Sequence, residues 1–412
     1  MHAHNDLALT EPLSPRRERW LLLALAGIQF THTLDFMIMM PLGPQFRALF
    51  GITDAQFGVL VSAYTLAAGA SGLLASAYVD RFGRRNLLLA MYGLFGLATL
   101  ACGLAPGYLA LMAARIAAGA FGGVLSALIQ TIVAEVVPFE RRGRAMAVVM
   151  TSFSVATVAG VPLGLWMAAR FSWHAPFFAI AGLSLLLGAM AAATLPALRA
   201  HLDTPAQPLA RMLRELVADA NHQRAFALSA LMMCGSFTVI PYITLYMQGN
   251  AGLRPDQIPA IYLCGGIATL VTARLIGRLS DRSGKLRSFR WLVLLATLPT
   301  LGVTLSAGLP LPGILVLTTL MFVFSSGRMI PGMALVAAAA QPGQRGAFMT
   351  LQSAVQSAAI GLASLIGGQL IHRDASGQLA GYWLAALVGV AASAAAWWLA
   401  PRLRLHGTGG KN

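Results

Sequence analysis

Twelve apolar runs, each long enough to cross a lipid bilayer, constrain this chain more than any other feature of its sequence. A helical span needs about 20 apolar residues to cross about 30 Å of hydrocarbon, so twelve spans take about 240 residues. The 412 residues then leave room for short loops, a central linker and tails. Only 10% of the residues are charged, against about 25% in soluble domains, which is too few to cover a water-facing surface. The sequence therefore predicts an all-α integral membrane protein.

The predicted spans are residues 20–42, 55–79, 86–104, 108–133, 145–169, 176–197, 224–248, 257–279, 289–307, 312–339, 348–371 and 381–400. They divide the chain into an N-tail (1–19), an N-terminal six-helix bundle (20–198), a linker (199–223), a C-terminal six-helix bundle (224–402) and a C-tail (403–412). The N-tail lacks the pattern of a cleavable signal, so the first run is interpreted as the first span itself.

Lysine and arginine are distributed unevenly between the two sides of the predicted bundle. With both termini in the cytoplasm, 22 of the 29 Lys and Arg residues fall in cytoplasmic segments and four in periplasmic loops. This asymmetry predicts a multi-pass protein of the bacterial inner membrane with cytoplasmic N- and C-termini and linker. The net charge of +15 is therefore explained by topology, and without a basic, aromatic-rich domain no nucleic-acid partner is expected.

The three cysteines are not expected to bind metal. Cys102, Cys234 and Cys264 all lie in apolar spans, and no pair has the spacing of metal ligands. They are interpreted as small buried hydrophobic residues.

Two short motifs recur at nearly the same offset along the chain. Asp80-Arg81-Phe82-Gly83-Arg84 follows the second span, and Asp281-Arg282-Ser283-Gly284-Lys285 follows the eighth, 201 residues later. Arg-Gly pairs at 142–143 and 345–346 repeat at an offset of 203. Two six-helix halves enter the membrane from the same side, so a pseudo-twofold axis along the membrane normal should relate them. A substrate site is then expected between the halves, near the middle of the membrane.

At these motifs the chain resembles the major facilitator superfamily. The loop after the second span is similar to that family's signature, with Ser76 at the position usually held by Gly. Further similarities are Arg115-x-x-Ala118-Gly119 in the fourth span and Gly160-x-Pro162-x-Gly164 in the fifth. The last of these resembles the twelve-span drug:proton antiporter and sugar-efflux-like branch. The resemblance implies a secondary transporter that works by alternating access.

The signature residues are expected to form a conformational latch. Asp80 and Asp281 would each face the N-terminus of a helix in the opposite half, where a carboxylate is stabilised by about 0.3–2 kcal/mol. The predicted latch residues are Asp80, Arg81, Gly83, Arg84, Asp281, Arg282 and Gly284. The alternative is that the arginines only set topology.

The fifth span is expected to bend and pack tightly at Gly160, Pro162 and Gly164. Small residues let membrane helices approach closely, and proline removes one backbone donor. The eighth span is the expected packing partner, and a purely structural role is the alternative. The small-residue run at 67–72 in the second span is interpreted as helix packing.

Ionisable residues inside the spans are the sharpest indication of a functional site, because each costs at least about 2.5 kcal/mol to insert. Asp35 and Arg115 lie at similar depths in the N-terminal half, so a pair between them is expected. His32 is one helical turn before Asp35, on the same face. In one interpretation Asp35 carries a proton, with His32 and Arg115 beside it. In the other, Asp35 is a permanent partner of Arg115 that only aids folding, and His32 is a packing residue.

Arg328 is the corresponding charge in the C-terminal half. The spans of that half contain no acid to neutralise it, so a substrate carboxylate or phosphate is one candidate partner. A backbone carbonyl, or the interface reached by snorkelling, is the other. One acid against three arginines inside the spans favours an anionic or zwitterionic substrate.

The remaining cavity candidates are polar or aromatic side chains on otherwise apolar spans. They are Gln29, Phe36, Met39, Tyr64, Gln130, Tyr242, Tyr246, Tyr262, Phe324, Gln352 and Gln356, together with Arg328.

Three functions are compatible with these features. The favoured one is proton-coupled efflux of small amphipathic molecules, with the proton gradient as energy source and no cofactor. The second is an uptake permease or facilitator for an anionic metabolite. The third is a membrane enzyme or sensor, but no cluster of catalytic residues supports it. Without a phosphate-binding Gly-rich loop, ATP is not the expected energy source. The expected partners are a small-molecule substrate and the lipid bilayer, with a monomer as the working unit.

Overall fold

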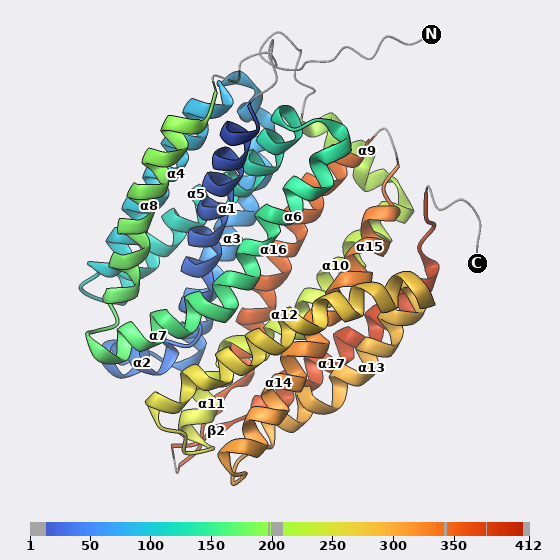
Figure 1. Cartoon of the computed structure of the whole chain (residues 1–412). Helices are drawn as coiled ribbons and strands as arrows, with labels where there is room; N and C mark the ends of the chain where they lie inside the picture. Colours follow the sequence, from blue (N-terminus) through green and yellow to red (C-terminus); the bar gives the residue numbers. More distant parts are fainter. Residues whose placement is uncertain (1–13, 197, 199–208, 342–343, 376, 407–412) are drawn as a thin grey trace, which may run out of the picture.

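A computed structural model describes residues 14–196, 198, 209–341, 344–375 and 377–406 of the chain (Figure 1). Within these residues, twelve helical segments are long and apolar enough to cross a membrane. The fold is all-α, with two six-helix bundles related by a pseudo-twofold axis along the membrane normal, as the sequence predicts. The predicted N-tail up to residue 13 and the linker between 199 and 208 lie outside the described residues.

The described residues of the N-terminal half form ten helical elements. They are α1 (Pro15–Ile38), α2 (Gly43–Phe50), α3 (Asp54–Tyr78), η1 (Val79–Arg81), α4 (Arg84–Gly103), α5 (Tyr108–Val136), α6 (Phe139–Val155), α7 (Val161–Arg170) and α8 (Ala175–Thr194), and the π-helical turn η2 (Ala156–Gly160) joins α6 to α7.

The C-terminal half follows a short helix, α9 (Leu209–Ala218). Its further elements are α10 (Ala220–Phe237), η4 (Ile240–Tyr242), α11 (Ile243–Gly249), η5 (Pro255–Gln257), α12 (Ile258–Ser283), α13 (Lys285–Thr304), α14 (Leu311–Gly327), α15 (Met329–Ala338), α16 (Arg345–Leu370), the two-residue strands β1 (His372–Arg373) and β2 (Leu379–Ala380), α17 (Tyr382–Leu399) and η7 (Ala400–Arg402).

Local sequence signals explain where several of these helices begin. Thr53 and Gln56 form a reciprocal capping box that starts α3. Asp219 caps α10 by accepting hydrogen bonds from the backbone N–H groups of Asn221 and His222. Pro176 and Pro312 occupy first-turn positions, where their missing N–H would have no helical partner.

Three predicted spans are interrupted in the structure. The first ends at Ile38, and the chain then forms the separate helix α2, which the apolar pattern does not reveal. The seventh breaks at η4, where Pro241 cannot donate to the helical ladder. The tenth divides into α14 and α15 at Arg328.

The two halves share an apolar core at only one end of the molecule. We call this the far end; α2, α11 and the β1–β2 hairpin lie there (Figure 1). At the opposite, basic end, where α1, α4, α6, α13 and α16 begin, each half has its own core. Apart from Leu73 at the edge of the second of these, the described side chains of the two basic-end cores do not mix. The halves are therefore closed against each other at the far end.

The closest contact between the halves joins α3 to α16. A Cβ atom at Gly58 would lie 3.3 Å from the Cα of Gly368, and one at Gly69 would lie 3.1 Å from the carbonyl oxygen of Ala354. These glycines let the two backbones approach closely between Gly58 and Gly69 of α3.

Candidate functional site

Asp35 and Arg115 form an ion pair that is completely buried inside the N-terminal half. Arg115 Nη1 lies 2.6 Å from Asp35 Oδ2, and both side chains have 0% exposure. The same nitrogen also donates to the backbone carbonyl of Asp35 at 3.2 Å. The other carboxylate oxygen of Asp35 has no hydrogen-bond partner among the described residues. The pairing expected from their similar depths is therefore present.

Tyr64 of α3 connects this ion pair to His32. The Arg115 guanidinium carbon lies 4.1 Å above the centre of the Tyr64 ring, a cation–π contact. The Tyr64 hydroxyl donates to the backbone carbonyl of His32 at 3.4 Å. A rearrangement of the Asp35–Arg115 pair could therefore change the position of His32 through Tyr64.

His32 has room for its ring because Gly122 of α5 faces it. A Cβ at Gly122 would lie 2.4 Å from Cδ2 and 2.6 Å from Nε2 of His32. Both ring nitrogens of His32 are buried and have no hydrogen-bond partner among the described residues. A buried imidazole without a partner among the described residues has hydrogen-bonding capacity left for a ligand.

A cavity of about 400 Å³ adjoins His32 and lies between α3, α5 and α16. Both halves contribute to its walls, which are formed by His32, Ala68, Gly72, Gly123, Ser126, Ala127, Gln130, Thr131, Gly346, Met349, Thr350, Ser353, Ala354 and Ser357. These residues supply hydroxyl, amide and imidazole groups but no carboxylate, lysine or arginine. The cavity therefore suits a small solute that forms neutral hydrogen bonds.

Two of the sequence-predicted residues, His32 and Gln130, line this cavity. Most of its polar wall was missed, because serine and threonine on an apolar helix usually serve packing. The available signal was their helical spacing: Ser126 precedes Gln130 by four residues, and Ser353 precedes Ser357 by four. The run at 67–72, interpreted as packing, both packs on α5 and lines the cavity through Ala68 and Gly72.

The other candidates on α1 pack inside the protein. Gln29 donates to Thr33 at 3.3 Å, and Met39 lies in the far-end core. The Phe36 ring stacks on Tyr64 with 5.7 Å between the ring centres. It also packs against Phe237 of the other half, with 6.1 Å between the ring centres. Phe36 therefore lies where the two halves meet.

Three tyrosines predicted to line the cavity lie instead in the far-end core. Tyr242 donates to the backbone carbonyl of Ser364, Tyr246 packs 4.9 Å from Tyr382, and Tyr262 shares a 2.9 Å hydrogen bond with Thr244. Their hydroxyls are thus used inside the closed far end rather than at the described cavity.

Gln352 and Gln356 of α16 point into the C-terminal half. Gln352 donates to Ser229 at 2.8 Å, and Gln356 lies 3.0 Å from the Met333 sulfur. One residue along a helix turns the side chain by about 100°. The neighbouring stripe at Ser353 and Ser357 therefore faces the cavity instead. Phe324 of α14 is half-buried and also lies outside the cavity wall.

Arg328 is 2% exposed and bound entirely by neutral groups among the described residues. It donates to Ser393 at 2.6 Å, to Ser236 at 2.9 Å and to the Met232 carbonyl at 3.2 Å. Gly235 makes this possible, since a Cβ there would lie 2.7 Å from Arg328 Nη2. Arg328 joins α10 to α17 and does not line the described cavity.

Among the described side chains, the signature residues make no ion pair between the halves. Arg84 pairs with Glu135 of its own half at 3.0 Å, while Arg81, Asp281 and Arg282 are exposed. Gly83 precedes α4, and Gly284 separates α12 from α13 with φ of +86°. The side chain of Asp80 lies outside the described part of the chain. The separate cores at the basic end are consistent with an unlatched state for Asp281, and the latch at Asp80 stays a prediction.

The fifth span bends through the π-helical turn η2 directly before its motif. Gly160 and Gly164 face α1, where a Cβ would lie 2.8 Å from Leu34 and 2.6 Å from Ile38. The expected contact with the eighth span is present, since both η2 and α7 contact α12, with Thr157 and Val158 of η2 against Gly266. Pro162 begins α7, where it needs no helical donor.

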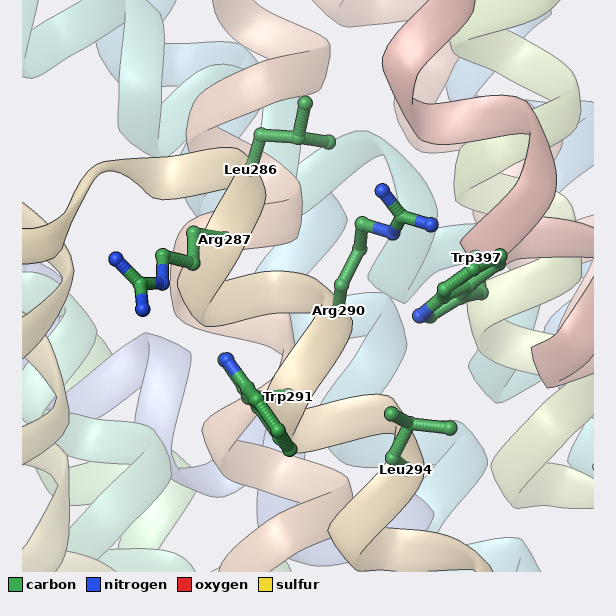
Figure 2. A pocket seen from close by; sticks show the side chains of 6 residues that line it. All are labelled: Leu286, Arg287, Arg290, Trp291, Leu294 and Trp397. Carbon is green, nitrogen blue, oxygen red and sulfur yellow. The ribbon is translucent and has the colours of Figure 1, made fainter.

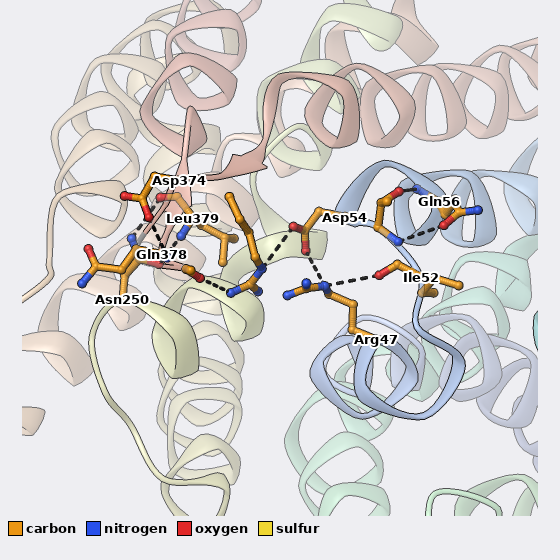
Figure 3. Close-up of polar contacts among 11 residues, drawn as sticks. Arg47, Ile52, Asp54, Gln56, Asn250, Asp374, Gln378 and Leu379 are labelled. Carbon is orange, nitrogen blue, oxygen red and sulfur yellow. Dashed lines mark hydrogen bonds and ion pairs between the residues drawn. The ribbon is translucent and has the colours of Figure 1, made fainter.

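At the far end, a carboxylate joins the two halves (Figure 3). Asp54 is 4% exposed and lies 3.5 Å from Arg47 of α2 and 3.5 Å from Arg373 of β1. The pKa of Arg373 lies below its usual value, because burial lowers it more than the charge of Asp54 raises it. Asn250 secures the same region by exchanging two hydrogen bonds of 2.9 and 2.8 Å with the backbone of Leu379. Arg47 and Arg373 are two of the four basic residues that the charge distribution places in periplasmic loops, and that distribution does not predict their pairing with Asp54.

No group of three or more His, Cys, Asp or Glu side chains that could hold a metal ion occurs among the described residues.

Comparison with known proteins gives the family and the fold. The model of the Major Facilitator Superfamily matches residues 25–327 and 225–410. The MFS-type transporter YceJ of Bacillus subtilis is 25% identical over 353 residues, which are 84% of this chain and 87% of that protein. The Chloramphenicol resistance protein of Streptomyces lividans is 28% identical over 61% of this chain and 64% of its own length. The xylose transporter XylE of E. coli matches with a TM-score of 0.73 at 16% identity, covering 96% of this chain and all of that one.

Proposed function

Because the chain belongs to the major facilitator superfamily and is a multi-pass membrane transporter, we propose that it exports small amphipathic molecules in exchange for protons. The proton gradient is the energy source, and no other cofactor takes part. One chain holds both halves and is the working unit.

The observation that carries this proposal is the buried Asp35–Arg115 pair beside His32. A membrane-embedded acid is costly and commonly belongs to a proton pathway. When Asp35 takes up a proton, its ion pair with Arg115 is lost, and the freed guanidinium needs a new partner. Tyr64 links this change to His32 at the cavity. Substrate in the cavity and a proton on Asp35 can therefore influence each other.

The cavity supports a substrate that is small and uncharged or weakly charged. Its walls offer hydroxyl and amide groups beside the apolar Ala127, Met349 and Ala354. The name of one relative contains chloramphenicol. This molecule carries hydroxyl and amide groups, so it fits the description and can serve as a probe.

The closed far end and the cavity on the basic side support alternating access. The excess of arginine at the basic end favours placing that end in the cytoplasm of a bacterial inner membrane, with both chain termini. The structure then corresponds to an inward-open state. In the opposite state the latch of Asp80 and Asp281 with the α16 and α6 N-termini would form.

A second candidate, uptake of an anionic metabolite, is favoured by Arg328, whose described partners are all neutral. Both Nη atoms of Arg328 are however bound by two serines and a carbonyl, and the residue does not line the cavity wall. Arg115, the other deeply buried cation, already has a carboxylate. The geometry therefore favours the exporter.

Inverted membrane vesicles with an acidic interior test the proposal. We expect the native protein to accumulate labelled chloramphenicol, and nigericin to abolish the accumulation. Asp35→Asn should lose the response to the pH gradient but keep gradient-independent exchange of chloramphenicol. Asp256→Asn is the matched control, because Asp256 is 65% exposed and pairs with Arg254 in a far-end loop.

Accumulation by Asp35→Asn that still follows the pH gradient would refute the coupling role. Since Asp35→Asn leaves Arg115 unpaired, the double variant Asp35→Asn/Arg115→Gln checks that a loss does not arise from unfolding. Failure of the native protein to move chloramphenicol in either direction would reject this substrate class.

A further inference from the structure

A second cavity lies on the outside of the C-terminal half, away from the seam between the halves. It has a volume of about 330 Å³ and lies between the first turns of α13 and the last turns of α17 (Figure 2). Its walls are Leu286, Arg287, Arg290, Trp291, Leu294 and Trp397. We propose that this cavity binds the phosphodiester headgroup of an anionic phospholipid from the leaflet at the basic end.

The cationic part of the cavity has unused hydrogen-bond donors. Arg290 points toward Trp397, and its guanidinium carbon lies 3.5 Å from the ring centre (Figure 2). Neither Arg287 nor Arg290 donates a hydrogen bond to another described residue, and the buried indole N–H of Trp397 has no partner there either. Two guanidinium groups and an indole N–H can all donate hydrogen bonds to the oxygens of a phosphate diester.

The charge around the cavity favours an anion. Its wall contains two arginines and no acid. Along the chain, Asp281 is outnumbered by Arg282, Lys285, Arg287 and Arg290. Clustered arginines beside a membrane span attract anionic lipids.

The order of residues along α13 matches the order of groups in a phospholipid. Arg287 and Arg290 lie in the first two turns, and Trp291, Leu294 and Leu298 follow toward the middle of the span. These three are 58%, 52% and 78% exposed, so they face the acyl chains. At the end of α17, Arg402 lies 3.1 Å above Trp398, which adds to the band of arginine and tryptophan typical of the interface. A headgroup at Arg287 and Arg290 would therefore place its chains against an apolar surface.

A lipid here would stabilise the packing of α13 on α17 within one half. It would not touch α3 or α16, which form the main seam between the halves. The site is thus independent of the proposed proton coupling and of the substrate cavity.

Native mass spectrometry of the full-length protein in detergent tests the proposal, with phosphatidylglycerol as the anionic probe and phosphatidylcholine as the zwitterionic one. We expect phosphatidylglycerol to bind more tightly, and Arg287→Gln/Arg290→Gln to weaken it by about tenfold or more. The control Arg16→Gln/Arg19→Gln removes the same charge from exposed positions at the same end and should change the affinity less than about twofold.

Two further measurements separate the sources of phosphate and locate the site. Inorganic phosphate at millimolar concentration should not displace the lipid, because it lacks the acyl chains. Phosphatidylglycerol with brominated chains should quench tryptophan fluorescence, and Trp291→Phe should reduce that quenching. Equal affinity for the two lipids, an unchanged affinity in the Arg287/Arg290 variant, or displacement by inorganic phosphate would overturn the proposal.

Discussion

Each half of the molecule buries an arginine inside a membrane span, but the two arginines are neutralised in different ways. Arg115 in the N-terminal half faces the Asp35 carboxylate at 2.6 Å, whereas Arg328 in the C-terminal half donates to two serine hydroxyls and a carbonyl. A carboxylate can gain or lose a proton, and a serine hydroxyl at this position cannot do so at physiological pH. The comparison shows that duplicated halves need not share one chemistry: the N-terminal half pairs its buried arginine with an acid, and the C-terminal half binds its own with neutral groups.

The largest expected difference between the halves concerns stability. Arg115→Met leaves the buried Asp35 carboxylate without a partner and should cost about 3–5 kcal/mol of unfolding free energy. Arg328→Met leaves only hydroxyls, and Ser393 already donates to the Gly389 carbonyl in its own helix, so its cost should be less than half as large. Equilibrium unfolding in detergent measures both. Equal costs would break the comparison, and Asp35→Asn/Arg115→Met should recover much of the loss.

The ion pair across the far end should have a smaller effect, on conformation rather than on folding. Arg373→Gln removes the contact from the C-terminal half to Asp54 and should shift the balance toward a far-end-open state by about fivefold, since a partly exposed pair is worth about 1 kcal/mol. Spin labels at Leu49→Cys and Asp256→Cys, with the three native cysteines replaced, report the distance between the halves. Arg170→Gln, exposed at the same end, is the control. An unchanged distance distribution would remove Asp54–Arg373 from the closure.

The smallest expected effect concerns how the stability contributed by two helix-capping residues at the basic end depends on pH. α1 is capped by the neutral Ser14, and α10 by the Asp219 carboxylate. Although burial raises the pKa of Asp219, hydrogen bonds from the His222 and Asn221 backbone, the charge of His222 and a bond from Gln341 lower it overall. A lowered pKa in the folded state gives stability that is present above the pKa of the unfolded chain, about 3.9, and lost as the pH falls through the folded value.

Asp219→Asn should therefore flatten the stability profile below about pH 4, while Ser14→Ala lowers stability by a similar amount at every pH. Thermal unfolding between pH 3 and 7 measures this. A parallel loss in Asp219→Asn across the whole range would show that the carboxylate charge contributes nothing.

The sequence predicted individual pairs only where depth along the helix decided the contact. Asp35 and Arg115 could be matched because both lie at one level of the same half. Tyr242, Tyr246 and Tyr262 could not be placed, because a polar group on an apolar helix serves equally in a cavity or in a closed seam. Gln352 and Gln356 were assigned to the cavity, although the face one residue further lines it. A helix that is apolar all round gives no amphipathic signal to show which face meets water.

The sequence by itself determined that this chain crosses a membrane twelve times in two parallel halves. The apolar runs, the placement of arginine and the repeated motifs were sufficient for this. A bilayer requires spans of a given length and an asymmetry of charge, and both can be recognised directly in the sequence. Tertiary structure alone decided that the far end is closed, that α3 and α16 form the seam, that Arg328 is bound by serines, and that arginine and tryptophan meet between α13 and α17. These outcomes depend on the rotation and tilt of each helix against its neighbours, and contacts distant in the chain set both.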